Sequence, residues 1–358
     1  MKARLAKLRC FLEHQGLEAV VINKLENVTY FSGFSGTDGI LLITKSSAKL
    51  ITDFRYIEQA TKEASLFEII EHHQSILNKV SEEIKLEPIT KVGFEGDSFT
   101  YNEFSILAQH LSTFKLKAVG LDQLRVVKDD LEIEKIRKAV AISDAAFDYI
   151  LTVIKPGVSE LIVAAELEMC MRRLGSSKPA FDTIVASGVR GSLPHGLATD
   201  KMIVEGDLVT MDFGAVYQGY HSDITRTVCV GRANDKQREI YNNVLDAQLL
   251  GVQTVEAGKS GKEIDAVARQ FIIDAGYGSF FGHGLGHGVG LAIHELPRLS
   301  PSSTCDKLEE NMIVTVEPGI YLPDFGGVRI EDTVVVTNTG CQVLTSSSKQ
   351  LIEIGGNP

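Results

Sequence analysis

The chain has 358 residues, of which 44% are hydrophobic and 23% charged, ordinary values for a globular protein that is long enough for two domains. Its formal charge of −11 argues against nucleic-acid backbones as the main partner, because binding them requires a basic surface. No apolar run approaches the roughly 20 residues of a membrane span, which argues against a membrane protein.

The first residues are basic, but residues 10–15 are too polar for the core of a signal peptide. They predict instead an amphipathic helix that ends near Gly16. The five cysteines are widely spaced and form no CxxC pair, which favours reduced thiols over disulfides or a thiolate zinc site. These features predict a cytoplasmic protein with no membrane partner.

Short apolar runs alternate with helical patterns up to about residue 120. The predicted strands are 19–22, 40–43, 49–52 and 91–94, and the predicted helices lie near 55–64, 73–86 and 101–112. This alternation predicts an α/β domain with a largely buried sheet.

The pattern then changes to a long helix. Asp129 or Asp130 is suitably placed to cap its N-terminus, and a Lys-Pro-Gly stretch at 155–157 would end it. We therefore predict an N-terminal α/β domain over residues 1–125 and a second domain over residues 126–358.

The second domain contains an internal repeat. In each half a glycine precedes a helix that ends at another glycine, and the two intervals, 157 to 175 and 258 to 276, are both 18 residues. An apolar strand that ends in an acidic residue follows each helix, and a second acid follows that one. These acids are Asp212 and Asp223 in the first half and Glu317 and Glu331 in the second. The carboxylates thus arrive as two equivalent pairs.

Each acidic pair is centred on a turn. The midpoint of the first pair falls at 217–219, and the midpoint of the second falls within 321–327. In an antiparallel hairpin the two acids would therefore face each other, with Cβ atoms roughly 5 Å apart. Carboxylates this close repel unless a cation lies between them. The alternative is a solvated hairpin face, which the apolar runs on both strands disfavour.

Three of the nine histidines, His283, His287 and His294, fall in a segment where glycines alternate with other residues. Alternating glycines exclude an ordinary helix and permit close backbone approach to a ligand or a strand. The segment has no GxGxxG fingerprint, and it fails the HExxH test because Arg298 stands where the second histidine belongs. An imidazole with four carboxylates suits a pair of divalent cations.

Two further residues are ambiguous from the sequence pattern alone. Arg329 shares a strand face with Glu331 by alternation, so it could orient a carboxylate ligand or contact a substrate, or be a surface arginine. His195, in a Pro-His-Gly stretch, is by itself more simply interpreted as a loop histidine.

These segments resemble the creatinase/aminopeptidase P/prolidase family of metallopeptidases, which have the pita-bread fold. The matching motifs are PHG (194–196), MDFGA (211–215), GYHSDITRT (219–227), HGLGH (283–287), VEPGIY (316–321) and GVRIED (327–332). A weaker resemblance covers the N-terminal domain around residues 27–34. The resemblance implies an α+β protein, in which a pita-bread catalytic domain with a pseudo-twofold repeat follows a creatinase-like α/β domain.

The resemblance also implies a role for each position. The ligands of two divalent metal ions would be Asp212, Asp223, His287, Glu317 and Glu331, with Mn²⁺ expected first and Co²⁺ or Zn²⁺ as alternatives. Water or hydroxide held between the ions would attack the scissile carbonyl. His195 would support the leaving group or the tetrahedral intermediate, and His283 and His294 would bind substrate and stabilise developing charge.

The implied activity is hydrolysis of the Xaa-Pro peptide bond by a homodimeric enzyme. A dipeptidase must bind a free proline carboxylate, and Arg298 matches the position where prolidases place an arginine for it. Arg329 and Tyr321 are further candidate substrate contacts. We therefore favour an Xaa-Pro dipeptidase over an Xaa-Pro aminopeptidase acting on longer peptides. A non-catalytic peptide-binding protein on the same fold is the alternative from another class.

Overall fold

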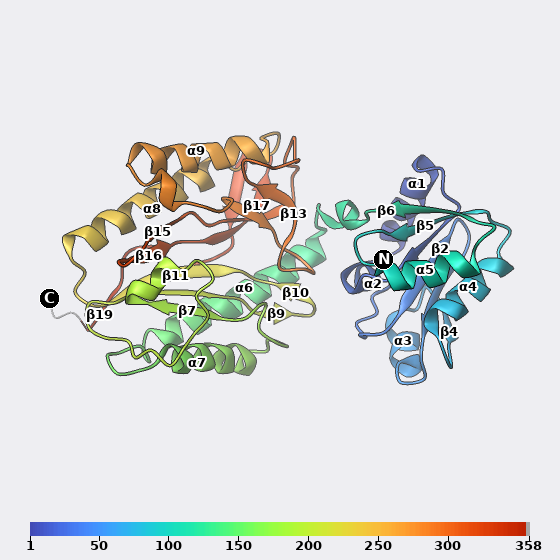
Figure 1. Cartoon of the computed structure of the whole chain (residues 1–358), viewed down its shortest axis with the longest axis horizontal. Coiled ribbons are helices and arrows are strands. Elements are labelled where there is room, and N and C mark those ends of the chain that lie inside the picture. Colours follow the sequence, from blue (N-terminus) through green and yellow to red (C-terminus); the bar gives the residue numbers. More distant parts are fainter. Residues whose placement is uncertain (356–358) are drawn as a thin grey trace. The chain divides into compact units, whose positions relative to one another are not determined.

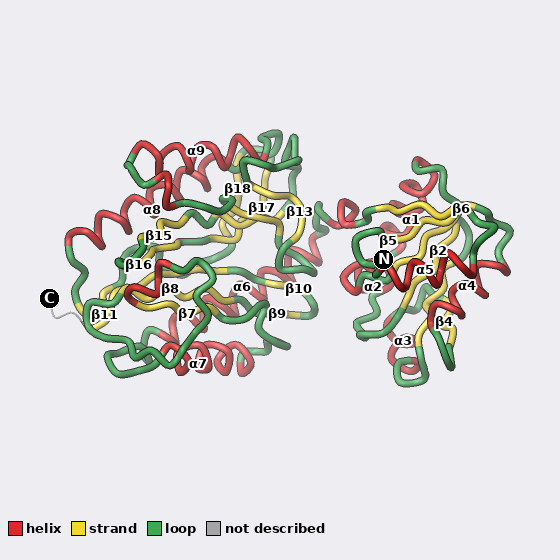
Figure 2. Tube along the Cα trace, viewed as in Figure 1, coloured by secondary structure: helices red, strands yellow, loops and turns green. Residues whose placement is uncertain are grey.

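The computed structural model describes residues 1–355, and the chain divides into two compact units, Met1–Arg125 and Val126–Pro358. Figures 1 and 2 show the course of the chain as a ribbon and as a tube. Each unit has hydrophobic core clusters of its own. In the part of the chain that the structure describes, no helix is long and apolar enough to cross a membrane.

The N-terminal unit is a mixed sheet with helices, in the strand order β4-β3-β2-β1-β5-β6. Its strands are β1 (Ala19–Ile22), β2 (Ile40–Thr44), β3 (Ala48–Thr52), β4 (Glu68–Glu71), β5 (Lys91–Glu95) and β6 (Lys115–Val119). Its helices are α1 (Lys2–His14), α2 (Leu25–Ser32), α3 (Ile57–Glu63), α4 (Ile76–Leu86) and α5 (Tyr101–His110), followed by a 3₁₀ turn at Asp122–Arg125. The strands and helices predicted for this unit are confirmed.

Three elements of this unit escape prediction from the sequence, namely α2, β4 and β6. The two strands lie at the edges of the sheet and are largely exposed, so they lack the buried run that marks β1 and β2. Charged side chains on an edge strand also discourage pairing with another chain. The expectation of a largely buried sheet therefore holds at its centre and is wrong at its edges.

In the second unit, the predicted repeat is visible as two helix pairs. Helices α6 (Asp130–Ile150) and α8 (Asp235–Thr254) each begin with a capping box, in which the cap side chain and the third helical residue exchange hydrogen bonds. Helices α7 (Glu160–Arg173) and α9 (Gly261–Asp274) are each capped by a serine. In Figure 1 the pair α6 and α7 lies on one side of the strands and the pair α8 and α9 on the other.

Two sheets lie between the helix pairs, in the strand orders β19-β11-β8-β7 and β13-β12-β14-β17-β18. The strands of this unit are β7 (Ile184–Ser187), β8 (Leu208–Phe213), β9 (Val216–Tyr217), β10 (Tyr220–His221), β11 (Ile224–Gly231), β12 (Gly286–Gly288), β13 (Glu295–Leu299), β14 (Ile313–Val316), β15 (Gly319–Leu322), β16 (Gly326–Arg329), β17 (Asp332–Thr337), β18 (Gly340–Val343) and β19 (Glu353–Gly355). Apolar residues of α6 and α7 form a core with the first sheet, and those of α8 and α9 with the second.

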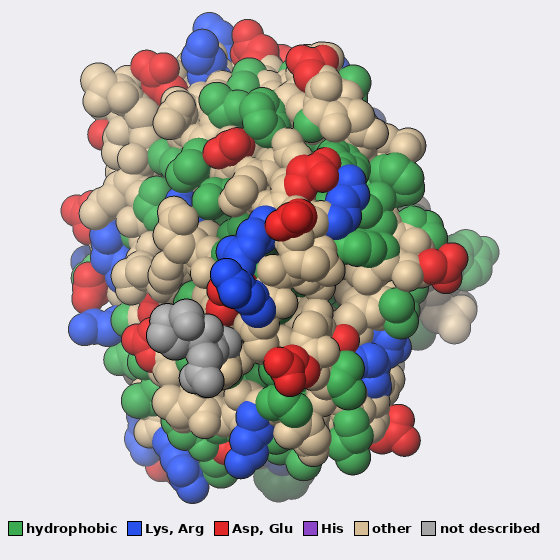
Figure 3. Space-filling model, turned by 90° about the vertical axis from the view of Figure 1, so that its left-hand side faces the viewer, with side chains coloured by type: hydrophobic (Ala, Val, Ile, Leu, Met, Phe, Trp, Pro, Cys, Tyr) green, Lys and Arg blue, Asp and Glu red, His purple; other side chains and the backbone are tan. Residues whose placement is uncertain are grey.

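One face of the molecule carries mixed charge. On the face drawn in Figure 3, acidic and basic side chains are interspersed among polar and apolar ones. The cysteines are free thiols, as predicted, and Cys229 is buried.

The first acidic hairpin differs from its prediction. Its turn consists of Gln218 and Gly219, whose φ angles of 49° and 85° are typical of a type I′ turn. The hairpin is therefore centred between these two residues, and Asp212 on β8 pairs with Thr225 on β11. The expectation that Asp212 faces Asp223 is wrong, because the two acids are offset along the ladder by two residues.

The second acidic hairpin follows its prediction. Strand β14 pairs with β17 so that Val316 lies opposite Asp332. One further step in this register places Glu317 opposite Glu331. The turn is centred at Asp324, as expected from the midpoint of the two glutamates, and its φ of 59° accommodates the reversal.

The glycine-rich segment forms a strand that is enclosed by its neighbours. A Cβ atom added to Gly286 would lie 2.0 Å from the carbonyl oxygen of Thr315, and one added to Gly288 would lie 2.2 Å from that of Leu296. Backbone therefore approaches backbone on both sides of β12, which is the use of glycine predicted for this segment.

We expect Gly286→Ala to lower the free energy of unfolding by about 2 kcal/mol or more, because the methyl group meets backbone that cannot move aside. Gly282→Ala is the matched control, since its Cβ would meet nothing within 4 Å. Denaturant unfolding of both variants checks this, and equal stability of the two would contradict the packing described for β12.

Candidate active site

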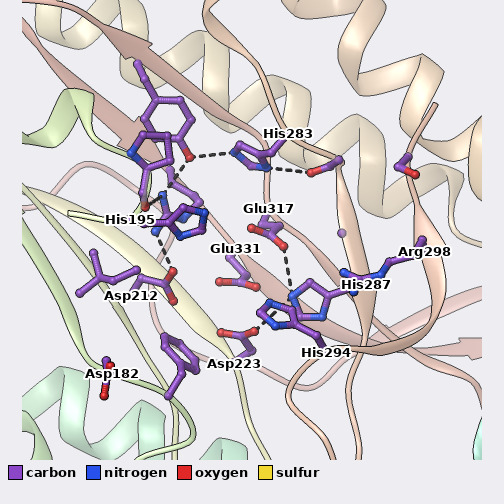
Figure 4. A pocket seen from close by; sticks show the side chains of 18 of the residues that line it. Asp182, His195, Asp212, Asp223, His283, His287, His294, Arg298, Glu317 and Glu331 are labelled. Atoms are coloured by element: carbon purple, nitrogen blue, oxygen red, sulfur yellow. Dashed lines mark hydrogen bonds and ion pairs between the residues drawn. The ribbon is translucent and has the colours of Figure 1, made fainter. Parts of the chain in front are cut away.

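Every residue predicted for the site lines the same cavity, which has a volume of about 670 Å³. These residues are Asp212, Asp223, Glu317, Glu331, His195, His283, His287, His294, Arg298, Tyr321 and Arg329. The cavity is completed by residues with no recognisable motif, among them Phe181, Asp182, Ile184, Leu197, Ser300 and Ser302. Figure 4 shows the carboxylates at its centre, with histidines and Arg298 around them.

The five candidate metal ligands come from strands of both sheets. Asp212 lies on β8 and His287 on β12, whereas Asp223, Glu317 and Glu331 directly precede or follow a strand. Strand ends hold their side chains in fixed directions while leaving the last residue free of the ladder. The repeat thus brings acids from two distant stretches of sequence to one place.

These side chains are close enough to share cations. Ligand atoms of Asp223, His287 and Glu331 lie within 4.8 Å of one another, and all three residues are buried. The Nε2 atom of His287 lies 3.5 Å from Oδ2 of Asp223 and 3.3 Å from Oε1 of Glu317. Among the described residues, Oδ1 of Asp212 and Oε1 of Glu331 are buried atoms without a hydrogen-bond partner.

Burial disfavours the ionised form of these carboxyl groups unless a cation is bound beside them. It raises the pKa of Asp223 well above its ordinary value, and repulsion from Glu331 and Asp212 adds to the shift. Burial likewise raises the pKa of Glu331 well above its usual range, with further repulsion from Glu317 and Asp212. It raises the pKa of Glu317 to about 8, against the opposing effect of Arg329. Divalent cations would supply the missing positive charge.

His287 is held in the form that a metal ligand needs. Its Nδ1 lies 3.0 Å from the carbonyl oxygen of Gly288, so Nδ1–H donates there and the lone pair of Nε2 points at the carboxylates. Burial, and next the field of His294, lower the pKa of His287 to about 3, so the ring is neutral at pH 7. A neutral nitrogen and carboxylate oxygens in contact fit a bound cation between them.

Arg329 is buried and bonded to the protein through each of its nitrogens. Nη2 donates to Oδ2 of Asp212 at 2.7 Å, and Nε donates to Oγ1 of Thr225 at 3.1 Å. Nη1 donates to the Tyr321 hydroxyl at 2.8 Å and to the carbonyl of Pro194 at 3.2 Å. The interpretation of Arg329 as a surface residue is therefore wrong.

Thr225 extends this network to a second acid. Its hydroxyl accepts from Arg329 and donates to Oε2 of Glu331 at 2.7 Å. The arginine therefore orients Asp212 directly and Glu331 through one threonine. No sequence motif marks Thr225 for this role, although its pairing opposite Asp212 in the hairpin places it there.

His283 lies at the end of the same network. Its Nδ1 lies 2.8 Å from the Gly284 carbonyl and its Nε2 lies 2.8 Å from the Tyr321 hydroxyl. With Nδ1–H donating to the carbonyl, Nε2 accepts from the tyrosine, and the tyrosine oxygen accepts from Arg329. Burial and the charge of Arg329 lower the pKa of His283 to about 4, while burial raises that of Tyr321 to about 12. Both groups are therefore neutral at pH 7.

The remaining predicted residues are more open to solvent. His195, His294 and Arg298 are exposed members of the cavity lining. His294 packs edge to face against His287, with ring centroids 4.3 Å apart, and burial followed by the nearby charge of Arg298 lowers its pKa. The Arg298 guanidinium makes no hydrogen bond or ion pair with any residue that the structure describes, so it is available to a ligand.

Comparisons with known proteins agree with this geometry. Residues 134–338 match metallopeptidase family M24, and residues 4–127 match the creatinase/prolidase N-terminal domain. A protein of Pyrococcus horikoshii named Xaa-Pro dipeptidase is 43% identical over 98% of this chain and 99% of its own.

Two solved structures extend the likeness. A structure described as Xaa-Pro dipeptidase from Bacillus anthracis is 47% identical and has a TM-score of 0.95, covering 98% of this chain and 99% of its own. One described as X-Pro aminopeptidase from Thermotoga maritima is 39% identical with a TM-score of 0.91, at the same coverage. The predicted family and fold are confirmed by this likeness.

We expect the metal-free protein to become less stable as the pH rises from about 5 to about 8. The pKa of Glu317 is 4.5 when unperturbed and about 8 in the folded protein. Between these values the folded state binds more protons than the unfolded state, so the free energy of unfolding falls with rising pH. Asp223 and Glu331 act in the same direction.

Bound divalent cations should reverse this effect, because they stabilise the ionised carboxylates. The gain in Tm on adding Mn²⁺ should therefore grow from pH 5 to about pH 8, as measured by thermal unfolding in chelator and in metal. Glu317→Gln should flatten the slope of the metal-free protein. A gain in Tm that is the same at both ends of this range would contradict the prediction.

Proposed function

The chain belongs to metallopeptidase family M24, and on that premise we propose that it hydrolyses the Xaa-Pro bond of dipeptides as an Xaa-Pro dipeptidase. The observation that carries the proposal is the unpartnered Arg298 in the same cavity as the five candidate metal ligands. A guanidinium there suits the free carboxylate of a carboxy-terminal proline.

Asp212, Asp223, His287, Glu317 and Glu331 would hold two divalent ions, and the orphaned oxygens of Asp212 and Glu331 fit that use. Carboxylate and imidazole donors without thiolates suit Mn²⁺, with Co²⁺ or Zn²⁺ as alternatives. When bound, the ions supply Lewis-acid polarisation of the scissile carbonyl and lower the pKa of water to near neutrality.

The side chains around the ligands have separate tasks in this proposal. Of the two tasks expected for Arg329, orienting a carboxylate ligand and contacting substrate, the contacts support the first, since Arg329 positions Asp212 and, through Thr225, Glu331. Tyr321 donates to Nε2 of His283 and so fixes the orientation of this neutral ring in the cavity lining. His195 and His294, which are exposed in the cavity, would contact the substrate and the departing proline nitrogen.

A proline substrate explains why a dedicated site is needed. The scissile amide nitrogen of an Xaa-Pro bond carries no N–H, so the site cannot hold it as a hydrogen-bond donor. Recognition must come from the two ends of the dipeptide instead. Arg298 supplies the group for the carboxylate end.

Xaa-Pro aminopeptidase activity is the second candidate, since the Thermotoga maritima structure similar over nearly the whole chain is described as one. In that case Arg298 would meet a peptide carbonyl rather than a carboxylate. We also propose, from the family resemblance, that the enzyme is a homodimer, and, from its free thiols, that it acts in the cytoplasm.

Removal of metal should abolish activity on Ala-Pro. We expect chelator-treated protein to release no proline from this dipeptide and Mn²⁺ to restore the release, with proline measured colorimetrically. Asp223→Asn should lower kcat by several orders of magnitude at any metal concentration, because it removes a buried candidate ligand. Full activity after exhaustive chelation would refute the two-metal proposal.

The two candidate activities separate on Ala-Pro and Ala-Pro-Ala. As a dipeptidase, the parent protein should cleave Ala-Pro in preference to the tripeptide. Arg298→Ala should raise KM for Ala-Pro by roughly 10- to 100-fold, the value of a charge-assisted contact. Arg232→Ala, which removes an exposed arginine outside the cavity, is the control. Unchanged KM for Ala-Pro in Arg298→Ala would reject the carboxylate assignment.

A further inference from the structure

The cavity contains an acid that the two-metal chemistry does not use. Asp182 lines it, and its exposed carboxylate makes no hydrogen bond or ion pair with any residue that the structure describes. In Figure 4, Asp182 and Arg298 lie on opposite sides of the cluster of candidate metal ligands. The sequence around Asp182 carries no motif that would mark it.

The backbone on both sides of Asp182 is anchored. Ala180 N–H donates to the Gly214 carbonyl at 2.8 Å, and the buried Thr183 donates through its hydroxyl to Glu168 on α7 at 2.9 Å. Asp182 therefore stands at a defined place in the lining.

Asp182 lies close in the chain to a residue that is paired with a candidate metal ligand. Ile184, the first residue of β7, is paired opposite Asp212, one of the candidate metal ligands. Asp182 lies two residues before it, which in extended chain is roughly 7 Å. Asp182 therefore lies near the candidate metal ligands on the side away from Arg298, where the amino-terminal residue of a dipeptide would lie.

The charged side chains of the cavity are of two kinds, those that are candidate metal ligands or are bonded to protein groups, and those that have no partner among the described residues. The carboxylates of Asp212, Asp223, Glu317 and Glu331 gather at its centre, and Arg329 is bonded to protein groups. The open charges are the carboxylate of Asp182 and the guanidinium of Arg298. This pair is complementary to a zwitterion that spans the centre, with its carboxylate at Arg298 and its positive charge near Asp182.

We propose that Asp182 is a specificity-determining residue that binds a positive charge on the amino-terminal residue of the substrate. The inference rests on the proposed Xaa-Pro activity and specifies the substrate at the end that Arg298 does not reach. The bound charge is an ammonium or guanidinium group, which comes either from the α-amino group of every dipeptide or from the side chain of Lys or Arg. Phe181 and Ile184, which flank Asp182 in the lining, offer apolar contact to the stem of such a side chain.

Asp182→Asn removes the charge with little change of shape, and its effect is measured on Ala-Pro, Lys-Pro and Glu-Pro with manganese-loaded full-length protein. If Asp182 binds the α-amino group, KM rises for all three dipeptides by a similar factor, roughly five- to tenfold. If it binds the side chain, KM rises for Lys-Pro, falls for Glu-Pro and stays constant for Ala-Pro. In both cases kcat changes little.

Asp246→Asn is the matched control, because it removes an exposed acid on α8 outside the cavity. Thermal unfolding of each variant shows whether the fold is retained. If the parent cleaves these dipeptides and Asp182→Asn leaves every KM as in the control, the inference is overturned while the proposed function stands. If the parent cleaves none of them, the proposed function and this inference both fall.

Discussion

The organising constraint of this structure is the enclosure of negative charge. Asp223 and Glu331 are 4% and 1% exposed, and the facing carboxylates of Asp212 and Glu317 lie in the same small space with one buried arginine beside them. Enclosing such charges without compensation costs far more than a domain's net stability, so they must be protonated or bind cations. The raised pKa values of the buried acids and the unpartnered oxygens are two expressions of that same excess of negative charge.

The duplicated architecture concentrates these groups. Each half supplies a hairpin that carries two acids. The glycine-rich strand β12 brings His287 beside these acids, because neighbouring strands can approach the glycine backbone closely. Hydrogen bonds then remove most of the remaining freedom. Thr225 holds Glu331, and Thr315 donates to Glu317 at 3.2 Å while accepting from the backbone N–H of His287 at 3.1 Å. The candidate metal-ligating atoms are therefore held in position without a bound metal ion.

Much of the fold and of the candidate site could be predicted from the residue pattern, and the predictions that failed did so for physical reasons. The repeat, the central strands and the set of cavity residues follow from periodicity, glycine spacing and acids at strand ends. The register of the first hairpin does not, because its two-residue turn lies one residue beyond the midpoint of the two acids and so displaces Asp212 from Asp223 by two positions. The edge strands β4 and β6 lack a buried face.

The hydrogen-bond partners of individual side chains could not be predicted from the residue pattern either. Nothing in the sequence distinguishes an arginine that contacts substrate from one whose donors are all bonded within the protein, so the network of Arg329 is apparent only in the folded structure. The open carboxylate of Asp182 is the opposite case, an acid outside any motif that becomes visible only because it lines the cavity.

The bonds of Arg329 also limit which substitutions this site can accept. One guanidinium joins an acid of the first half, a tyrosine of the second and the backbone beside His195. Substitutions at these positions cannot have independent effects, since each leaves the others with an unsatisfied buried partner. A change at any one of them is therefore penalised until its neighbours change as well, whereas a change at the exposed Asp182 or Arg298 leaves no buried protein group without a partner and can alter substrate preference alone.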